Sequence, residues 1–278
     1  MKLVSISGRR KRINLNVKSR WLILAALIAL FTFSTVMLIL TQYGYISARR
    51  EYDELREIAF SPKASPNNEN NTGESEVPLD NTDAQQGGDS TPNGSDATTQ
   101  DDIIINHDAL EEINPDYIGW ISIEGTAIDY PVVRCRNNSK YIYTTFSGEN
   151  NNAGAIFLDS LCKTGFGGYA MLHGHNMDDG SMFKDLHKYL NSNFLDENPE
   201  IIIFIPSGER LTYRIFDVKL TNINDSLYSL RGTSKQVRDS HFSRYDIEED
   251  ADILVLSTCT SSANRNERLL VVAVREGQ

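Results

Sequence analysis

A cysteine and an arginine stand at facing ends of two apolar runs near the C-terminus. The run DILVLSTC ends at Cys259, and the next run, LLVVAV, begins directly after Arg268. If both runs are strands of an antiparallel hairpin, residues 260–267 connect them and the two side chains share a site. A guanidinium beside a cysteine can stabilise a thiolate and the oxyanion that forms when the sulfur attacks a carbonyl carbon. The spacing therefore predicts acyl transfer by a cysteine nucleophile, with Arg265 in the connecting loop as a rival for the arginine's role.

A nucleophilic cysteine needs a partner that transfers protons, and the candidate is a histidine in GYAMLHGHNMDDGSMF. His173 and His175 are two residues apart at a predicted strand end, so they point the same way if the strand stays regular. The pair could serve a metal, but no acidic or cysteine ligand follows at a recognised interval, so no metal site is predicted. Gly174 and His175 open a loop that leads into a predicted helix. Functional side chains often lie in such loops, which favours His175 as the proton carrier.

Residues next to these three are candidates for contacting a substrate. Ser257 and Thr258 immediately precede Cys259, and Asn176 follows His175. For Ser257 and Thr258, packing within a strand or turn is an equally good explanation. No motif in the chain predicts a cofactor.

Seven short runs of β-branched or aromatic residues, each bounded by turn residues, predict the strands that position these side chains. They are AIDYPVVR (127–134), NAGAIFLD (152–159), GGYAMLHGH (167–175), EIIIFI (200–205), LTYRIFDVKL (211–220), DILVLSTC (252–259) and LLVVAV (269–274). Helical patches at 105–113, 181–190 and 227–242 interrupt them. Many short strands with few helices predict a mostly β domain, either a barrel or a sandwich.

The body of the chain, residues 102–278, is long enough for one domain with its own core. The three cysteines of the chain form no CxxC pair, which argues against zinc-ribbon and thioredoxin-like proteins. Cys135 and Cys162 could form a disulfide in an exported domain, and they could equally be two small apolar side chains.

An apolar run precedes the body. Residues 21–40 carry no charge and are long enough to cross a bilayer as a helix, so residues 21–42 are interpreted as a transmembrane anchor. A cleaved signal peptide is the alternative, but the run exceeds the usual apolar region of a signal peptide and no convincing A-x-A site follows it. Residues 1–20 form a basic tail, whose seven Lys and Arg predict a cytoplasmic N-terminus, a single membrane pass and an extracellular body.

Two segments connect the anchor to the body. Residues 43–60 include RREYDELREIAF, whose helical spacing and mixed charge predict a juxtamembrane helix. Residues 61–101 are rich in Asn, Ser, Thr, Gly, Pro and acids and contain no aromatic residue. Such a segment cannot bury enough apolar surface to offset its ordering entropy. The sequence predicts a disordered acidic linker, a flexible tether that holds the domain at a distance from the membrane.

The chain has a formal net charge of −11, and the charge is unevenly distributed. The acids are concentrated after the apolar run, whereas the basic tail contains none. An acidic body would repel phosphates, so a nucleic-acid partner is not expected.

Taken together, these motifs resemble those of the sortase family. GHNMDDGSMF resembles the class B form of the family's Gly-His motif, and LSTC followed by an arginine at the next strand resembles its cysteine and arginine motifs. NPDYIGWISIEGTAIDYPVVR and NAGAIFLD are also similar to class B. The resemblance covers residues 103–278.

The resemblance implies an eight-stranded sortase β-barrel and a cysteine transpeptidase. Cys259 would attack a backbone carbonyl in a C-terminal sorting signal and form a thioacyl-enzyme, which an amine would then resolve. His175 would protonate the departing amine and deprotonate the incoming one, and Arg268 would hold the substrate carbonyl or oxyanion. The implied partners are substrate proteins that carry a sorting signal, and an amine on a peptidoglycan precursor or a pilin lysine.

The resemblance also implies roles for two other parts of the chain. Residues 221–251 match the enlarged helical connection of class B and are expected to form one wall of the substrate groove. His173 stands where the family tends to carry another residue, so it is expected to be a neighbour of the site.

Two other functions compete with the transpeptidase. One is a different extracytoplasmic cysteine peptidase, which would release its product to water. Papain-like peptidases place the cysteine early, at a helix start, with the histidine later, and this chain reverses both features. The other is a non-catalytic anchored binding domain, in which Cys259 is merely buried.

Overall fold

The computed structural model describes residues 16–61, 104–245, 247–248, 250–260 and 266–277. The chain divides into two compact units between Ala48 and Arg49. The predictions for the first fifteen residues, for almost all of the acidic linker and for Arg265 lie outside the described residues.

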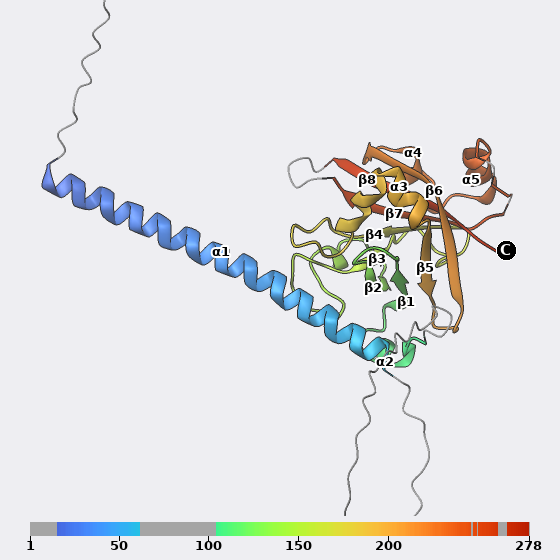
Figure 1. Ribbon diagram of the computed structural model, residues 1–278, viewed down its shortest axis with the longest axis horizontal. Helices are drawn as coiled ribbons and strands as arrows, with labels where there is room; N and C mark the ends of the chain where they lie inside the picture. The colour runs from blue at the N-terminus through green and yellow to red at the C-terminus, as the bar shows by residue number, and fades with distance from the viewer. Residues whose placement is uncertain (1–15, 62–103, 246, 249, 261–265, 278) are drawn as a thin grey trace, which may run out of the picture. The chain divides into compact units, whose positions relative to one another are not determined.

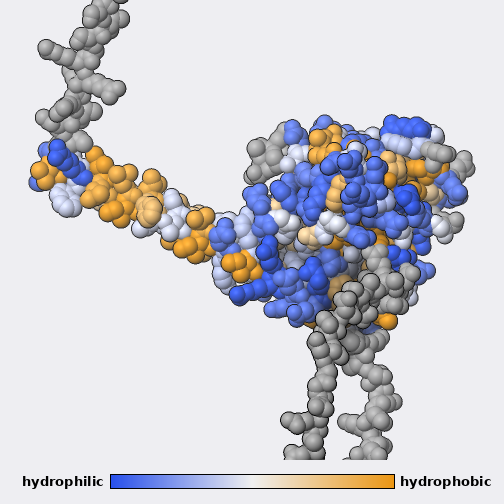
Figure 2. All heavy atoms as spheres, in the orientation of Figure 1, coloured by the Kyte–Doolittle hydropathy of each residue, from blue (hydrophilic) through white to orange (hydrophobic). Residues whose placement is uncertain are grey.

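Helix α1 (Val17–Ala59) is one uninterrupted helix, which includes both the apolar run and the segment predicted as a separate juxtamembrane helix. Within the first unit its large hydrophobic side chains are exposed, and most of its spheres in Figure 2 are orange. By length and composition the helix could cross a membrane, a test that a signal sequence near the N-terminus also passes.

The last three turns of α1 belong to the second unit and pack against its strands and loops. Tyr52, Leu55 and Ala59 lie on one face of the helix and are 4%, 2% and 0% exposed. The Tyr52 hydroxyl donates a hydrogen bond of 2.6 Å to the Gly154 carbonyl. This part of the helix is therefore a component of the second unit's core.

The described residues that flank positions 62–103 are hydrogen-bonded to each other in the second unit. The backbone N–H of Asn106 donates to the carbonyl oxygen of Ala59 at 2.8 Å, and Ile105 beside it is buried. The described residues on both sides of the predicted linker therefore belong to the second unit.

Eight strands form a closed barrel in the order β1-β2-β3-β4-β7-β8-β6-β5 (Figure 1). Their bounds are β1 (Tyr117–Ser122), β2 (Asp129–Arg134), β3 (Ile156–Leu158), β4 (Tyr169–His173), β5 (Glu200–Phe204), β6 (Arg210–Asn222), β7 (Ile253–Cys259) and β8 (Glu267–Arg275). The pairs β2–β3 and β4–β7 are parallel, and the other neighbours are antiparallel. The eight-stranded barrel expected from the resemblance is confirmed.

Each of the seven predicted runs contains a strand, and β1 is the strand that the pattern of apolar runs missed. Gly119 interrupts the apolar pattern of β1 at a point of close approach. A Cβ at this position would lie 2.8 Å from the carbonyl oxygen of Phe204 on the neighbouring β5. The next residue, Trp120, is fully buried.

Short helices occupy the connections between strands. They are α2 (His107–Ile113), η2 (Lys140–Ile142), η3 (Lys184–Leu190), α3 (Ser192–Glu197), α4 (Ser226–Ser229) and α5 (Lys235–Phe242). Helices α4 and α5 lie in the long connection from β6 to β7, where the sequence predicts helical structure. The helix predicted at 181–190 is a 3₁₀ helix that begins at Lys184.

The parallel pair β4–β7 positions the site. All residues of these strands are buried except the last of each, His173 and Cys259. Parallel strands covered on both faces read as continuous apolar runs, which is how both appear in the sequence. Because the two strands run in the same direction, their last residues lie at the same rim of the barrel.

Candidate active site

Cys259 and Arg268 face each other across the hairpin of β7 and β8. The strands are antiparallel, and their register pairs Cys259 directly with Arg268. Directly opposed residues place their Cβ atoms about 4.5–5.5 Å apart. Both residues are half-buried, so each has one side toward solvent. The hairpin predicted from the spacing is therefore present.

His175 reaches the same rim from β4. Strand β4 pairs in parallel with β7, with His173 opposite Ser257, and the Gly174 N–H continues the pairing to the Ser257 carbonyl at 3.2 Å. The chain after β4 thus runs beside the chain that ends at Cys259. His173 and Ser257 are register partners. His175 comes two residues after His173, and Cys259 comes two residues after Ser257, so both lie equally far beyond the paired positions.

The imidazole of His175 is oriented by a backbone carbonyl. Its Nε2 lies 2.7 Å from the Ile142 carbonyl oxygen, and the Tyr143 ring packs beside it with ring centres 6.2 Å apart. A carbonyl oxygen can only accept a hydrogen bond, so Nε2 must carry a hydrogen. This leaves Nδ1 as the atom that can take up and release a proton.

The packing around position 174 explains why a glycine precedes this histidine. A Cβ at position 174 would lie 2.6 Å from Ile156 Cδ1 and 2.6 Å from Phe183 Cδ2. Such distances are not tolerated, so any larger residue would displace the backbone that carries His175.

One pocket of about 320 Å³ is lined by all three residues that the sequence predicts as catalytic. Cys259, His175 and Arg268 line it together with Ser257, Thr258 and Arg231. A thiol, an imidazole and a guanidinium in one pocket form a set suited to nucleophilic acyl transfer.

The three predicted substrate contacts differ in position. Ser257 and Thr258 line the pocket but are each only 2% exposed. The Ser257 hydroxyl is 2.7 Å from the Tyr228 hydroxyl, whereas the Thr258 hydroxyl has no partner among the described residues. Asn176 is not among the residues that line the pocket. Its amide donates to the Thr260 carbonyl at 3.1 Å, which links the loop after β4 to the end of β7.

The two other cysteines are free thiols in different surroundings. Cys162 is 1% exposed, and burial raises its pKa to about 11, so it is a poor nucleophile. Cys135 lines a separate surface pocket with Arg134 and Lys163. Cys259 is the cysteine that shares a pocket with a histidine and an arginine. Among the described residues, no cluster of three His, Cys, Asp or Glu side chains could hold a metal ion.

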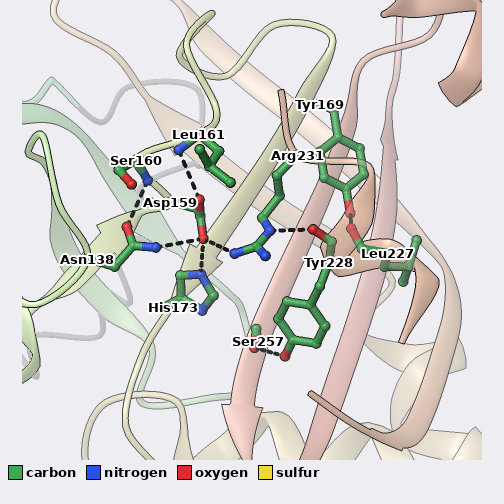
Figure 3. A network of polar contacts seen from close by, with 10 residues as sticks. All are labelled: Asn138, Asp159, Ser160, Leu161, Tyr169, His173, Leu227, Tyr228, Arg231 and Ser257. Atoms are coloured by element: carbon green, nitrogen blue, oxygen red, sulfur yellow. Dashed lines mark hydrogen bonds and ion pairs between the residues drawn. The ribbon is translucent and has the colours of Figure 1, made fainter. Parts of the chain in front are cut away.

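Sequence reasoning missed a polar network beside the pocket (Figure 3). Its centre is Asp159, whose side chain is completely buried and accepts hydrogen bonds from His173 at 2.9 Å and Arg231 at 2.5 Å. His173 is thus a neighbour of the site, as expected, with a buried carboxylate as partner. Asp159 and Arg231 are 72 residues apart in the sequence and belong to no shared motif, so no local signal pointed to them.

Comparison with known proteins gives one consistent result. The family described as "Sortase domain" matches residues 121–276. A Listeria monocytogenes protein named Sortase B is 29% identical over 175 residues, which cover 59% of this chain and 70% of the relative.

Solved structures agree with this match. The Clostridium perfringens sortase B superposes with a TM-score of 0.56 at 29% identity, covering 62% of this chain and all of that one. The Staphylococcus aureus sortase B–substrate complex gives 0.54 at 26% identity, with 60% and 83% covered.

Proposed function

The chain belongs to the sortase family, with class B sortases as its relatives, and on that premise we propose that it is a membrane-anchored cysteine transpeptidase. Its substrates are proteins that carry a C-terminal sorting signal. The register pairing of Cys259 with Arg268, in one pocket with His175, is the observation that carries the proposal.

In the first half-reaction the Cys259 thiol gives its proton to Nδ1 of His175, and the sulfur attacks a backbone carbonyl carbon of the sorting signal. The carbonyl oxygen becomes an oxyanion, which the Arg268 guanidinium stabilises by charge and hydrogen bonding. The C–N bond then breaks, and the departing amine takes a proton from Nδ1 of His175. The products are a thioester on Cys259 and the released downstream peptide.

In the second half-reaction an amine attacks the thioester carbonyl. Nδ1 of His175 takes a proton from the attacking nitrogen, the C–S bond breaks, and the departing sulfur takes that proton, which restores the Cys259 thiol. The result is a new amide bond to a peptidoglycan precursor or a pilin lysine. Splitting one amide exchange into two steps is the advantage that covalent catalysis offers.

The substrate site is supported by one relative and by the position of the pocket. The Staphylococcus aureus sortase B was solved as a complex with its substrate. In this chain the residues before Cys259 line the pocket, and so does Arg231 from the connection between β6 and β7. We place the sorting signal in this pocket, with the β6–β7 connection as one wall.

The apolar part of α1 supports a membrane anchor. We propose a single pass with a cytoplasmic N-terminus, so that the barrel faces the cell wall. The candidate span and the basic residues of the first twenty positions are the observations behind this orientation.

A hydrolytic peptidase and a non-catalytic binding domain predict different products. The test uses the full-length chain in detergent, a mixed library of quenched sorting-signal peptides and an amine acceptor. We expect mass spectrometry to show an acyl adduct on Cys259 and a ligated product that requires the amine. Cleavage without amine-dependent ligation would indicate a hydrolase. Absence of any adduct, together with resistance of Cys259 to alkylation, would favour a binding domain.

Two variants assign the roles of individual residues. Cys259→Ala should abolish both cleavage and ligation, and activity that survives in it would refute the nucleophile assignment. Arg268→Gln should lower kcat/KM by roughly 10²–10³-fold, the range seen when one oxyanion donor is lost. Arg214→Gln on β6 is the matched control. It removes an exposed arginine that does not line the pocket and should leave kcat/KM unchanged.

A further inference from the structure

Arg231 lines the pocket of Cys259 but has no role in the reaction described above. Its guanidinium is held at two atoms. Nη1 donates to the Asp159 carboxylate at 2.5 Å, and Nε donates to the Tyr228 carbonyl at 2.5 Å. The side chain remains 22% exposed, although its carboxylate partner is completely buried. Nε and Nη1 of Arg231 are therefore held by the protein, while part of the side chain is accessible to solvent.

Asp159 is a rigid support for this arginine. Its Oδ2 accepts hydrogen bonds from Arg231, from His173 Nε2 and from Asn138 Nδ2, the last two at 2.9 Å. Its Oδ1 accepts from the Leu161 N–H at 3.0 Å. A buried carboxylate that accepts four hydrogen bonds is fully paired, and rotation of its side chain would break several of these bonds. Figure 3 shows these partners converging on it from separate segments of the chain.

Tyr228, on α4, connects the segment that carries Arg231 to the strands beside it. The Arg231 guanidinium lies 5.3 Å from the centre of the Tyr228 ring, within the range of a cation–π contact. The His173 ring is nearly parallel to that of Tyr228, with an interplanar angle of 9°. The Tyr228 hydroxyl is 2.7 Å from Ser257, two residues before Cys259. The segment from α4 to Arg231 is thus fastened to β4 and β7 close to Cys259.

The arrangement leaves Nη2 of Arg231 without a hydrogen-bond partner among the described residues, although the guanidinium has five N–H donors. The charge of Arg231 is already balanced by Asp159, so a second carboxylate would gain less here than beside an isolated arginine. A neutral oxygen suits the remaining donors better. Side-chain amides and peptide carbonyls supply such oxygens in an extended peptide.

We propose that Arg231 is a substrate-binding residue that donates through Nη2 to a neutral oxygen of the sorting peptide, and that Asp159 is the positioning residue that holds it there. This assignment deepens the proposed function and rests on it for the identity of the peptide. Arg268 stabilises the reacting carbonyl oxygen, whereas Arg231 donates a hydrogen bond to another oxygen of the same peptide and so contributes to specificity.

The test measures peptide binding, so that it does not depend on turnover. Full-length Cys259→Ala protein in detergent is titrated with the library of sorting-signal peptides, and the tightest binder is retained. In the Cys259→Ala background, Arg231→Gln should raise Kd roughly 10- to 100-fold, which is the loss of one charge-assisted hydrogen bond. Arg214→Gln in the same background, which removes an exposed arginine of β6 outside the pocket, should leave Kd unchanged.

A scan of the peptide identifies the acceptor. Each side chain is replaced by alanine and each backbone carbonyl by a thioamide, which is a weaker acceptor. One replacement should weaken binding to the protein that retains Arg231 and have no further effect on Arg231→Gln. Equal Kd values for the two proteins, or an Arg231→Gln effect that no peptide replacement removes, would overturn the proposal. Failure of every library peptide to bind would overturn it as well.

Asp159→Asn tests the positioning role. It should raise Kd by a similar factor, and the double variant with Arg231→Gln should bind no more weakly than either single variant. Additive losses would show that Asp159 acts independently of Arg231. If Asp159→Asn fails to fold, the Arg231→Gln comparison still decides. Acylation of Cys259 in wild-type protein, measured separately, shows whether the transpeptidase proposal stands when this one fails.

Discussion

Single residues at the barrel rim have little freedom, and Gly174 is the clearest case. A Cβ added there would overlap two core side chains, Ile156 and Phe183, at 2.6 Å each. The overlap would be relieved by movement of the backbone, and the next residue along that backbone is His175. At this position the packing of the core therefore also determines where His175 is placed.

Gly174→Ala is therefore expected to lower both activity and stability. Overpacking typically costs about 1–3 kcal/mol in free energy of unfolding, and displacement of His175 should lower kcat/KM at least roughly tenfold. Gly167→Ala is the control, because a Cβ there would meet nothing closer than 3.7 Å. Thermal unfolding and ligation assays on both variants check this, and equal behaviour of the two would contradict it.

Asp159 couples the polar network to pH. Burial alone would raise its pKa, but hydrogen bonds from His173, the Leu161 N–H and Arg231 outweigh it and hold the pKa well below the ordinary value. A carboxyl group whose folded pKa is depressed stabilises the fold at pH values above its unfolded pKa of about 4. That contribution is lost as pH falls below this value toward the folded pKa.

Asp159→Asn should therefore be most destabilising near neutral pH. We expect a loss of about 3–5 kcal/mol at pH 7, as for other buried ion pairs that lose one partner, and a smaller difference from wild type at pH 3. Thermal unfolding at the two pH values measures this, with the exposed Asp178→Asn as control. A difference in Tm that does not change with pH would argue against a charged Asp159 in the folded protein.

Among the elements, the C-terminal end of α1 contributes to the packing of the second unit. Besides its buried face, Arg56 donates from Nε to the Asp129 carboxylate at 2.7 Å, and the same carboxylate accepts from Trp120 Nε1 at 2.6 Å. The Phe60 ring packs edge-on against Trp120 with ring centres 5.7 Å apart. The helix end is therefore connected to β1 and β2 by both polar and apolar contacts.

A chain that begins at Arg49 should consequently be more stable than one that begins at Asp102, the domain boundary predicted from composition. Loss of the three buried side chains of the helix face should cost at least about 3 kcal/mol. For a domain of this size, that loss corresponds to a Tm lower by roughly 6 °C or more. Thermal unfolding of the two truncated chains measures the difference. Equal Tm values would support the predicted boundary at 102.

The acidic segment offers a second test at the scale of elements. Ala59 and Asn106, which flank this segment, are hydrogen-bonded to each other, so a short connection is long enough to join them. Replacement of residues 62–103 by a short Gly-Ser linker should leave Tm and ligation activity of the full-length chain unchanged. A loss of activity at unchanged Tm would reveal a function for this segment that its composition does not predict.

For the whole molecule, charge and hydropathy are segregated along the chain. A basic start is followed by the apolar part of α1. The second unit (residues 49–278), called the barrel unit below, carries a large excess of acidic over basic residues. The exposed face of this unit in Figure 2 is mostly hydrophilic. Lys and Arg near a membrane span favour the cytoplasmic side, whereas acids contribute little to orientation.

In protoplasts, external protease should therefore digest the barrel unit and leave an N-terminal tag protected. Replacement of the seven basic residues of positions 1–20 by Gln should reduce the fraction of chains with this orientation. Replacement of basic residues on α5 should have no effect. Digestion of the N-terminal tag in intact protoplasts would refute the orientation.

The sequence alone was sufficient for the features that repeat locally. The strands β4 and β7 are apolar runs because both of their faces are buried, and a run of that kind is visible without any tertiary information. The hairpin of Cys259 and Arg268 follows from two such runs and a short connection. For the same reason the apolar part of α1 could be identified from composition, whereas β1 was missed because Gly119 breaks its pattern.

Features that depend on segments distant in the chain were decided only by the tertiary structure. Nothing in the sequence near Asp159 distinguishes it from a solvated aspartate. It is a buried centre of charge because closure of the barrel brings β4 and the β6–β7 connection against it. The packing of α1 and the return of the chain at Asn106 are likewise non-local contacts. Local composition fixes which residues prefer burial, but the closure of the chain selects which polar groups are buried with them and which partners they find.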